Sequence, residues 1–144
     1  MITIYDQLVS WIGRYVSVPL LLTRLTIGVI FIESGFGKLT HLSDATQFFM
    51  EIGIPFPYLN ALLTSSTELL AGAFVLLGFL TRIAAIPLTI IMLVAIITAQ
   101  FTHIGSISEF FVLQEWDYIV MLSVVIFSGP GKASIDYLLR RTPR

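Results

Sequence analysis

Four apolar segments, each long enough to cross a bilayer, constrain this chain more than any other feature. They cover residues 18–37, 58–80, 83–102 and 110–128. A membrane-spanning helix needs roughly 20 mostly apolar residues, and its backbone hydrogen bonds must be satisfied within the helix because lipid offers no partners. The sequence therefore predicts an all-α polytopic membrane protein, a four-helix bundle forming a single domain over residues 1–144.

The composition agrees with lipid as the solvent. Only 12% of the 144 residues are charged and 56% are hydrophobic, whereas a soluble domain has about 25% charged residues. The net charge of −1 gives no basic surface for nucleic acid. The chain has no cysteine and only two histidines, far apart in sequence, so we expect no metal site and no covalently attached cofactor.

The distribution of basic residues predicts the topology. Four spans place both termini on one side of the membrane, and that side then holds six basic residues against Lys38 alone on the other. Lysine and arginine are enriched in cytoplasmic loops, so we predict a multi-pass protein with cytoplasmic termini. The six residues are Arg14, Arg82, Lys132, Arg140, Arg141 and Arg144.

Three further segments have the pattern of short amphipathic helices at the membrane interface. Residues 2–16 are either such a helix or an extension of the first span. Residues 44–52 predict a surface or re-entrant helix that ends at Gly53 and the Ile-Pro-Phe-Pro run. Residues 132–144, after Gly129-Pro130-Gly131, predict an amphipathic tail.

Ionisable residues inside the spans are the main candidates for function. Arg24 and Glu33 lie in the first span, roughly 180° apart around the helix, so they cannot pair with each other. Glu68 lies about half-way along the second span. A charge near the bilayer centre costs roughly 2.5–3.5 kcal/mol on insertion scales, so such residues usually face a partner or a watery cavity. Gly28 and Gly35 share a face with Arg24 and should let a neighbouring helix approach closely.

With this topology, polar side chains from all four spans converge in the outer half of the bundle. We expect a polar pocket there, open toward the outer face, that binds a small amphipathic molecule or relays protons. Glu68 and Glu33 are the candidate proton-transfer residues. The candidate ligand-binding residues are Arg24, Lys38, Gln100, His103 and Asp117.

Structural roles compete with these interpretations. The same residues could only hold the helices together, although interhelical hydrogen bonds in bilayers average about 0.6 kcal/mol, a small return for burying ionisable groups. His103 could be a solvated interfacial residue. Arg24 could be the partner of an acid or of a ring of carbonyls, with an anionic headgroup as a further alternative.

Three ordered fragments resemble the DoxX family of membrane proteins. They are Arg24-x3-Gly28 with Gly35-x2-Lys38-Leu39, then Glu68-Leu-Leu-Ala-Gly72 with Leu77-Gly-Phe-Leu-Thr-Arg82, and finally Gly129-Pro-Gly-Lys-Ala-Ser-Ile-Asp136. Glu33 is a departure from the pattern, because many members carry histidine or another residue there. The resemblance implies a four-span bundle in the bacterial cytoplasmic (inner) membrane, similar to membrane subunits of quinone-linked oxidoreductases.

Three functions are consistent with these observations. The first is a quinone-interacting redox subunit, with quinone as the diffusing cofactor and Glu68 and Glu33 exchanging protons near its head. The second is a non-enzymatic accessory or assembly subunit of a membrane complex, and the third is a small lipid- or solute-binding or transport protein. Besides the bilayer, the expected partner is a second copy of the chain or a membrane or redox protein; whether the chain is itself an enzyme is left open.

Overall fold

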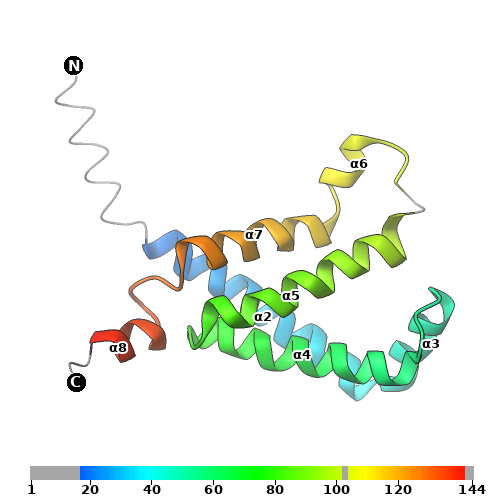
Figure 1. Cartoon of the computed structure of the whole chain (residues 1–144), viewed down its shortest axis with the longest axis horizontal. Helices are drawn as coiled ribbons and strands as arrows, with labels where there is room; N and C mark the ends of the chain where they lie inside the picture. Colours follow the sequence, from blue (N-terminus) through cyan, green and yellow to red (C-terminus); the bar gives the residue numbers. More distant parts are fainter. Residues whose placement is uncertain (1–16, 102–103, 142–144) are drawn as a thin grey trace.

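The computed structural model describes residues 17–101 and 104–141, and every regular element within these ranges is a helix (Figure 1). The predicted helix over residues 2–16 and the candidate ligand-binding residue His103 lie outside the described residues. The elements are α2 (Ser17–Thr40), α3 (Leu42–Glu51), α4 (Pro57–Leu77), α5 (Thr81–Ala95), the π-helical turn η1 (Ile96–Gln100), α6 (Ile107–Phe111), α7 (Gln114–Ser128) and α8 (Ile135–Arg141).

Three helices are long and apolar enough to cross a membrane: α2 with 24 residues, α4 with 21, and the continuous segment Thr81–Gln100 with 20. They coincide within a few residues with the first three predicted spans. A very tight turn joins α4 to α5. In this turn, Gly78 and Leu80 both adopt left-handed backbone conformations. α4 and α5 therefore form a helical hairpin, and α5 begins at Thr81 rather than Ile83.

The fourth predicted span, 110–128, was wrong in its bounds. A break at Val112 and Leu113 separates α6 from α7, and α7 has only 15 residues, roughly 22 Å at 1.5 Å per residue. Glu115 and Asp117 lie in the first turn of α7, where acids are favoured by the helix dipole. Phe110 and Phe111 of α6 fold back onto Trp116, with ring centroids 4.9 and 5.6 Å away.

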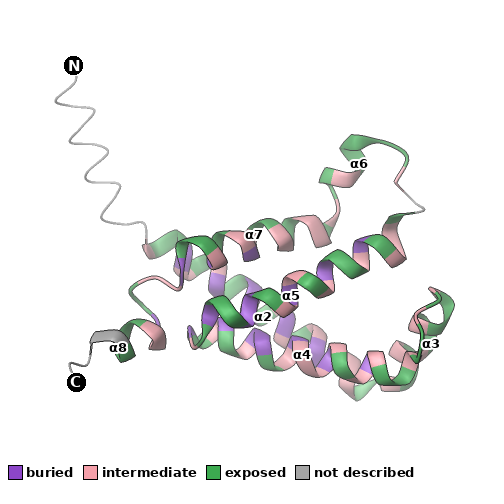
Figure 2. Ribbon diagram, in the orientation of Figure 1, coloured by how far each residue is buried: buried purple, intermediate pink, exposed green. Residues whose placement is uncertain are grey.

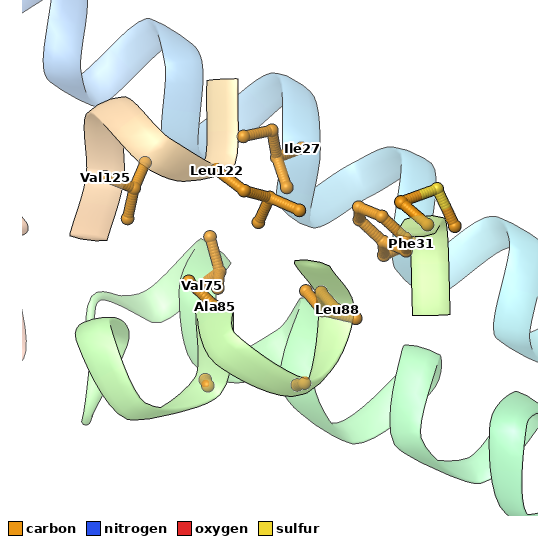
Figure 3. Packing of buried hydrophobic residues seen from close by; sticks show 10 residues of the cluster. Ile27, Phe31, Val75, Ala85, Leu88, Leu122 and Val125 are labelled. Carbon is orange, nitrogen blue, oxygen red and sulfur yellow. The ribbon is translucent and has the colours of Figure 1, made fainter. Parts of the chain in front are cut away.

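One hydrophobic core joins α2, α4, α5 and α7 (Figure 2). Figure 3 shows Ile27 of α2 beside Leu122 of α7, with Leu88 of α5 and Val75 of α4 facing them. The outward faces of the same helices carry exposed large apolar side chains, such as Leu22, Leu70 and Ile83. This arrangement of apolar residues on both the inside and the outside is typical of helices surrounded by lipid.

The molecule has two distinct ends. The α8 end, at the left of Figure 1, holds the start of α2, the α4–α5 turn, the end of α7 and α8. The α3 end holds the end of α2, α3, the start of α4, η1, α6 and the start of α7. α4 and α5 diverge from their turn toward the α3 end, so their axes lie farther apart there than at the turn (Figure 1). The predicted helix at 44–52 is confirmed as α3.

Candidate functional site

The site is positioned by the close crossing of α2 over α4. A Cβ added at Gly35 would lie 2.5 Å from the Leu69 nitrogen, and one at Gly28 would lie 2.6 Å from Leu76 Cβ. Gly72 of α4 faces Phe31 in the same way, at 2.9 Å. The prediction that Gly28 and Gly35 form a contact face is confirmed, and this contact fixes the rotation of α2 against α4.

Glu68 is fully buried on the face of α4 that this crossing turns toward α2. Lys38 Nζ donates to both carboxylate oxygens, at 2.7 and 2.8 Å, and Ser34 Oγ donates to Oε2 at 2.9 Å. Ser34 and Lys38 are four residues apart, one turn of α2, so both reach the same carboxylate. The lysine side chain is 36% exposed while the glutamate is 0% exposed. The pair therefore connects a buried carboxylate to the surroundings of the α3 end.

A cavity of about 890 Å³ adjoins this pair, between α4 and α5 at the α3 end. Its wall is mostly apolar, with α3 and α5 supplying most of the apolar side chains: Ala45, Phe48, Phe49, Ile52, Ile90, Ile91, Met92, Val94 and Ala95. Polar groups come from α2, α3, α4, η1 and α7: Lys38, His41, Asp44, Asn60, Thr64, Glu68, Thr98, Gln100, Gln114, Glu115 and Tyr118. The cavity thus combines a mostly apolar wall with polar groups, the usual chemistry of a small-molecule site.

The polar wall opposite α2 is built by η1 and α7. Gln100 Nε2 donates to Glu115 Oε1 at 3.1 Å, which ties the end of η1 to the first turn of α7. η1 is a π-helical turn at the end of α5, and such turns occur frequently at functional sites. It places Thr98, Ala99 and Gln100 on the cavity wall.

The structure brings together only some of the predicted site residues. Lys38, Glu68 and Gln100 line the cavity, but Glu33 is exposed on α2 and is not among the lining residues. Asp117 is likewise exposed and outside the lining. Glu33 is two residues before Gly35, about 160° away around the helix at 100° per residue, so it points away from α4. The expected pairing of Glu33 with Glu68 in one chamber was therefore wrong.

Arg24 lies at the other end of the crossing, in a cage of carbonyls. Its Nε donates to Val75 O at 3.1 Å and its Nη2 to Leu76 O at 3.0 Å, while Nη1 donates to Pro130 O at 2.6 Å and Ala133 O at 2.8 Å. Carbonyls in the last turn of a helix have no partner within the helix, so Arg24 caps α4. With its guanidinium so engaged and only 1% exposed, Arg24 fits the ring-of-carbonyls role and is not part of the cavity.

Asp136 completes this clamp at the α8 end. Its carboxylate accepts from the backbone nitrogens of Leu80 (2.8 Å) and Thr81 (3.0 Å) and from Thr81 Oγ1 (2.9 Å). Its own nitrogen donates to Gly78 O at 2.9 Å. The Gly-Pro-Gly segment and α8 are thereby fixed to the α4–α5 turn. Gly78 has no room for a side chain, since an added Cβ would lie 2.3 Å from Arg24 Nη2.

Several site residues were not predicted from the sequence. Ser34, Glu115 and Tyr118 were not among the predicted site residues, and Asp136 was noted only in the family resemblance. The one-turn spacing of Ser34 and Lys38 was a usable signal for a shared partner. The pairing of Gln100 with Glu115 had no such signal, because it depends on how α7 packs on η1. Within the described residues, no group of three or more histidine, aspartate or glutamate side chains could hold a metal ion.

Comparison with known proteins agrees with this geometry. The DoxX family profile matches residues 19–101, which contain α2, α4, the buried Glu68 and Arg24. The chain belongs to the DoxX family. This DoxX-family chain is accordingly a multi-pass membrane protein with the three long helices described above. No solved structure matches it significantly.

Curated relatives of the DoxX-family chain cover most of its length. The "Uncharacterized membrane protein Rv3486" of Mycobacterium tuberculosis is 32% identical over 129 residues, 82% of this chain and 79% of the relative. The "Putative oxidoreductase CatD" of Bacillus subtilis is 30% identical over 111 residues, 77% of this chain and 78% of the relative. The "Inner membrane protein YqjF" of Escherichia coli is 25% identical over 124 residues, 86% and 94% of the two chains.

Proposed function

We propose that this protein is a quinone-interacting subunit of a redox system in the bacterial inner membrane. The observation that carries the proposal is the fully buried Glu68, ion-paired to Lys38 beside a largely apolar cavity. An ionisable pair inside a membrane is costly and marks a functional site by default. One relative is named as an oxidoreductase and another as an inner membrane protein, which supports the redox setting and the location.

The residues of the cavity fit the head of a quinone. The volume of about 890 Å³ falls within the range of roughly 300–1,000 Å³ for small-molecule sites. Phe48, Phe49 and Ile91 offer apolar surface for a flat ring. Lys38 and Gln100 are hydrogen-bond donors for quinone carbonyls, and Glu68 is an acceptor for the hydroxyls of the reduced form.

The chemistry proposed for this chain is proton delivery. Reduction of a quinone to a quinol takes up two electrons and two protons, and here the electrons come from a reduced redox protein bound as a partner. Lys38 gives the buried carboxylate a route to the α3 end because a third of its side chain is exposed. Glu68 would hold a proton beside the ring and pass it to a ring oxygen, and Lys38 would orient that oxygen by a hydrogen bond.

We further propose that α7 is the fourth crossing and that the α8 end is cytoplasmic. Of the described residues, the exposed Arg82 and Lys132 lie at that end, as expected for the cytoplasmic side. A 15-residue helix is short for a bilayer core of roughly 30 Å, and local thinning or the adjoining residues can make up the difference. Cysteine labelling at Lys132 and Gly53 in intact spheroplasts would test this, with only the Gly53→Cys variant labelled from outside.

The quinone proposal is tested by binding to purified protein in nanodiscs freed of native quinone. We expect a quinone with a single isoprene unit to bind the wild-type chain in calorimetric titration. Glu68→Gln and Lys38→Met should each weaken binding about tenfold, equivalent to about 1.4 kcal/mol. The matched controls are Glu51→Gln and Lys132→Met, because both residues are exposed and neither lines the cavity. Equal affinity of Glu68→Gln and wild type, or no binding at all, would overturn the proposal.

A second candidate function is that of an accessory subunit that docks a partner complex through the α8 end. The observation that favours it is the rigid attachment of α8 through Asp136, which leaves Leu138 65% and Leu139 60% exposed. Affinity purification of the tagged protein from its native membrane would decide. A stoichiometric partner lost in a Leu138→Ser/Leu139→Ser variant supports docking, and a lone protein with quinone-dependent activity contradicts it.

A further inference from the structure

Three large apolar residues of the cavity wall are also exposed, and so are the polar lining residues His41, Asp44 and Gln114 at the α3 end. Phe48 of α3 is 49% exposed, and Ile90 and Val94 of α5 are 55% and 45% exposed. A side chain that both lines a cavity and is exposed marks the rim of an opening. One opening, with an apolar rim, therefore lies between α5 and the α3–α4 segment, where α4 and α5 diverge (Figure 1).

The depth of this rim in the membrane follows from the helix that carries it. Ile90 lies at the middle of the 20-residue segment Thr81–Gln100, and Val94 lies roughly 6 Å further along at 1.5 Å per residue. On the opposite wall, Thr64 and Glu68 both lie within about 5 Å of the middle of α4. The hydrocarbon layer extends roughly 15 Å on either side of its centre. The α5 part of the rim thus lies at the depth of the acyl chains.

Apart from Thr64 and Glu68, the polar groups of the cavity lie farther toward the α3 end. Lys38 belongs to the last turn of α2, Gln100 is the last residue of η1, and Glu115 is in the first turn of α7. The cavity therefore runs from a polar end near the membrane surface to an apolar rim near the membrane centre. Its ligand should have the same polarity gradient, with a polar head and an apolar tail.

We propose that the cavity opens sideways into the hydrocarbon layer and takes a long-tailed lipid directly from the bilayer. The head lies against the Lys38–Glu68 pair, and the tail leaves over the rim formed by Phe48, Ile90 and Val94. The inference rests on the proposed function only for the identity of the head as a quinone. A cavity that opened to the aqueous phase alone would instead select a ligand without a tail.

The absence of cysteine from the chain allows a test that needs no ligand. Thr64→Cys is labelled with bimane and reconstituted in phosphatidylcholine vesicles, and Thr98→Cys serves as a second cavity position. Quenching by lipids with brominated acyl chains is compared with quenching by aqueous iodide. Leu70→Cys, exposed on α4 and outside the cavity lining, calibrates contact with lipid. Lys132→Cys, exposed in the loop before α8, calibrates contact with water.

We expect the brominated lipids to quench the cavity labels to an extent similar to the Leu70 label, with little effect of iodide. Quenching by iodide as strong as at Lys132 without quenching by lipid would overturn the proposal, as would a label that neither quencher reaches. Because no quinone is present, this result is independent of whether the proposed function is correct.

A second experiment tests the path of the tail. A bismaleimide linker joins Phe48→Cys to Val94→Cys across the rim, and each single-cysteine variant treated with the same reagent is the control. We expect the linked protein to bind a quinone with a long isoprenoid tail about tenfold more slowly, and to bind the single-isoprene quinone at nearly the unlinked rate. An equal effect on both quinones, or on neither, contradicts the lateral path. Failure of the unlinked protein to bind either one refutes the proposed function, and the quenching experiment then decides the opening.

Discussion

Replacing Lys38 by methionine should destabilise the protein by about 3 kcal/mol, because it leaves the carboxylate of Glu68 without its counter-ion. Lys38 Nζ lies 2.7 and 2.8 Å from the two carboxylate oxygens, and Glu68 is fully buried. Removing one partner of a buried pair costs about 3–5 kcal/mol. The lysine is 36% exposed and solvent screens the pair in part, so the lower end of that range applies.

Neutralising the other partner of the pair, Glu68, should destabilise the protein much less. In Glu68→Gln the side-chain amide oxygen can still accept from Ser34, and the freed lysine can turn its charge toward the α3 end. We expect a loss of about 1 kcal/mol, that of an ordinary hydrogen bond. In the double variant no charge is stranded, so its loss should be about 2 kcal/mol. The two single losses then exceed the double loss by about 2 kcal/mol, within the range found for residues in contact.

The free energy of unfolding can be measured in mixed micelles by titration with a denaturing detergent, or by steric trapping in bicelles. Lys132→Met is the matched control, since it removes an exposed lysine at the α8 end and should change stability by less than about 0.5 kcal/mol. Two results would refute the reasoning. One is a Lys38→Met loss below about 1 kcal/mol, and the other is additivity of the single losses within about 0.5 kcal/mol.

Three further predictions follow from the helix contacts. Arg24→Met should cost about 3–5 kcal/mol by the same unfolding assay, since it leaves the buried carbonyls at the end of α4 and in the Gly-Pro-Gly segment without their donor. Arg24→Lys should cost less but not nothing, because lysine keeps the charge and loses the planar fork; equal losses would contradict the cage. Gly35→Ala should destabilise the protein by about 1–3 kcal/mol, because its Cβ overlaps the backbone of α4. Gly37→Ala should stabilise it by about 0.5–1 kcal/mol, because nothing lies within 4 Å of the added Cβ. Melting curves should therefore shift in opposite directions for the two variants. Glu33→Gln should leave the calorimetric affinity for quinone unchanged, because Glu33 does not line the cavity. A loss of affinity as large as that of Glu68→Gln would instead support proton transfer by both Glu33 and Glu68.

The helical class and the long helices were determined by the sequence alone. A run of about 20 apolar residues can satisfy its backbone groups in lipid only as a helix, so α2, α4 and α5 with η1 followed from composition along the chain. The contact face of α2 followed from the spacing of Gly28 and Gly35, since small residues mark the closest approach between helices. The alternatives for Arg24 already included the cage of carbonyls that the structure contains.

The direction in which Glu33 points could also have been predicted from the sequence. Gly35 faces α4, and at 100° per residue Glu33 lies about 160° away from it, whereas Lys38 lies about 60° away. Combining the glycine face with this arithmetic would have removed Glu33 from the pocket and retained Lys38. Glu33 and Glu68 were grouped by their similar depth in the membrane. Depth alone does not say in which direction each side chain points from its helix.

Other features were decided only by the tertiary structure. The break that shortens α7, the π-turn that places Gln100 against Glu115, and the anchoring of Asp136 on the α4–α5 turn each join residues far apart in sequence or depend on how one helix packs on another. Local apolar patterns carry no information about such contacts, because lipid accepts an apolar side chain on any face of a helix. Length and hydropathy thus determine that these helices form, while close packing at glycines and buried charges determines which faces meet and where a cavity is left between them.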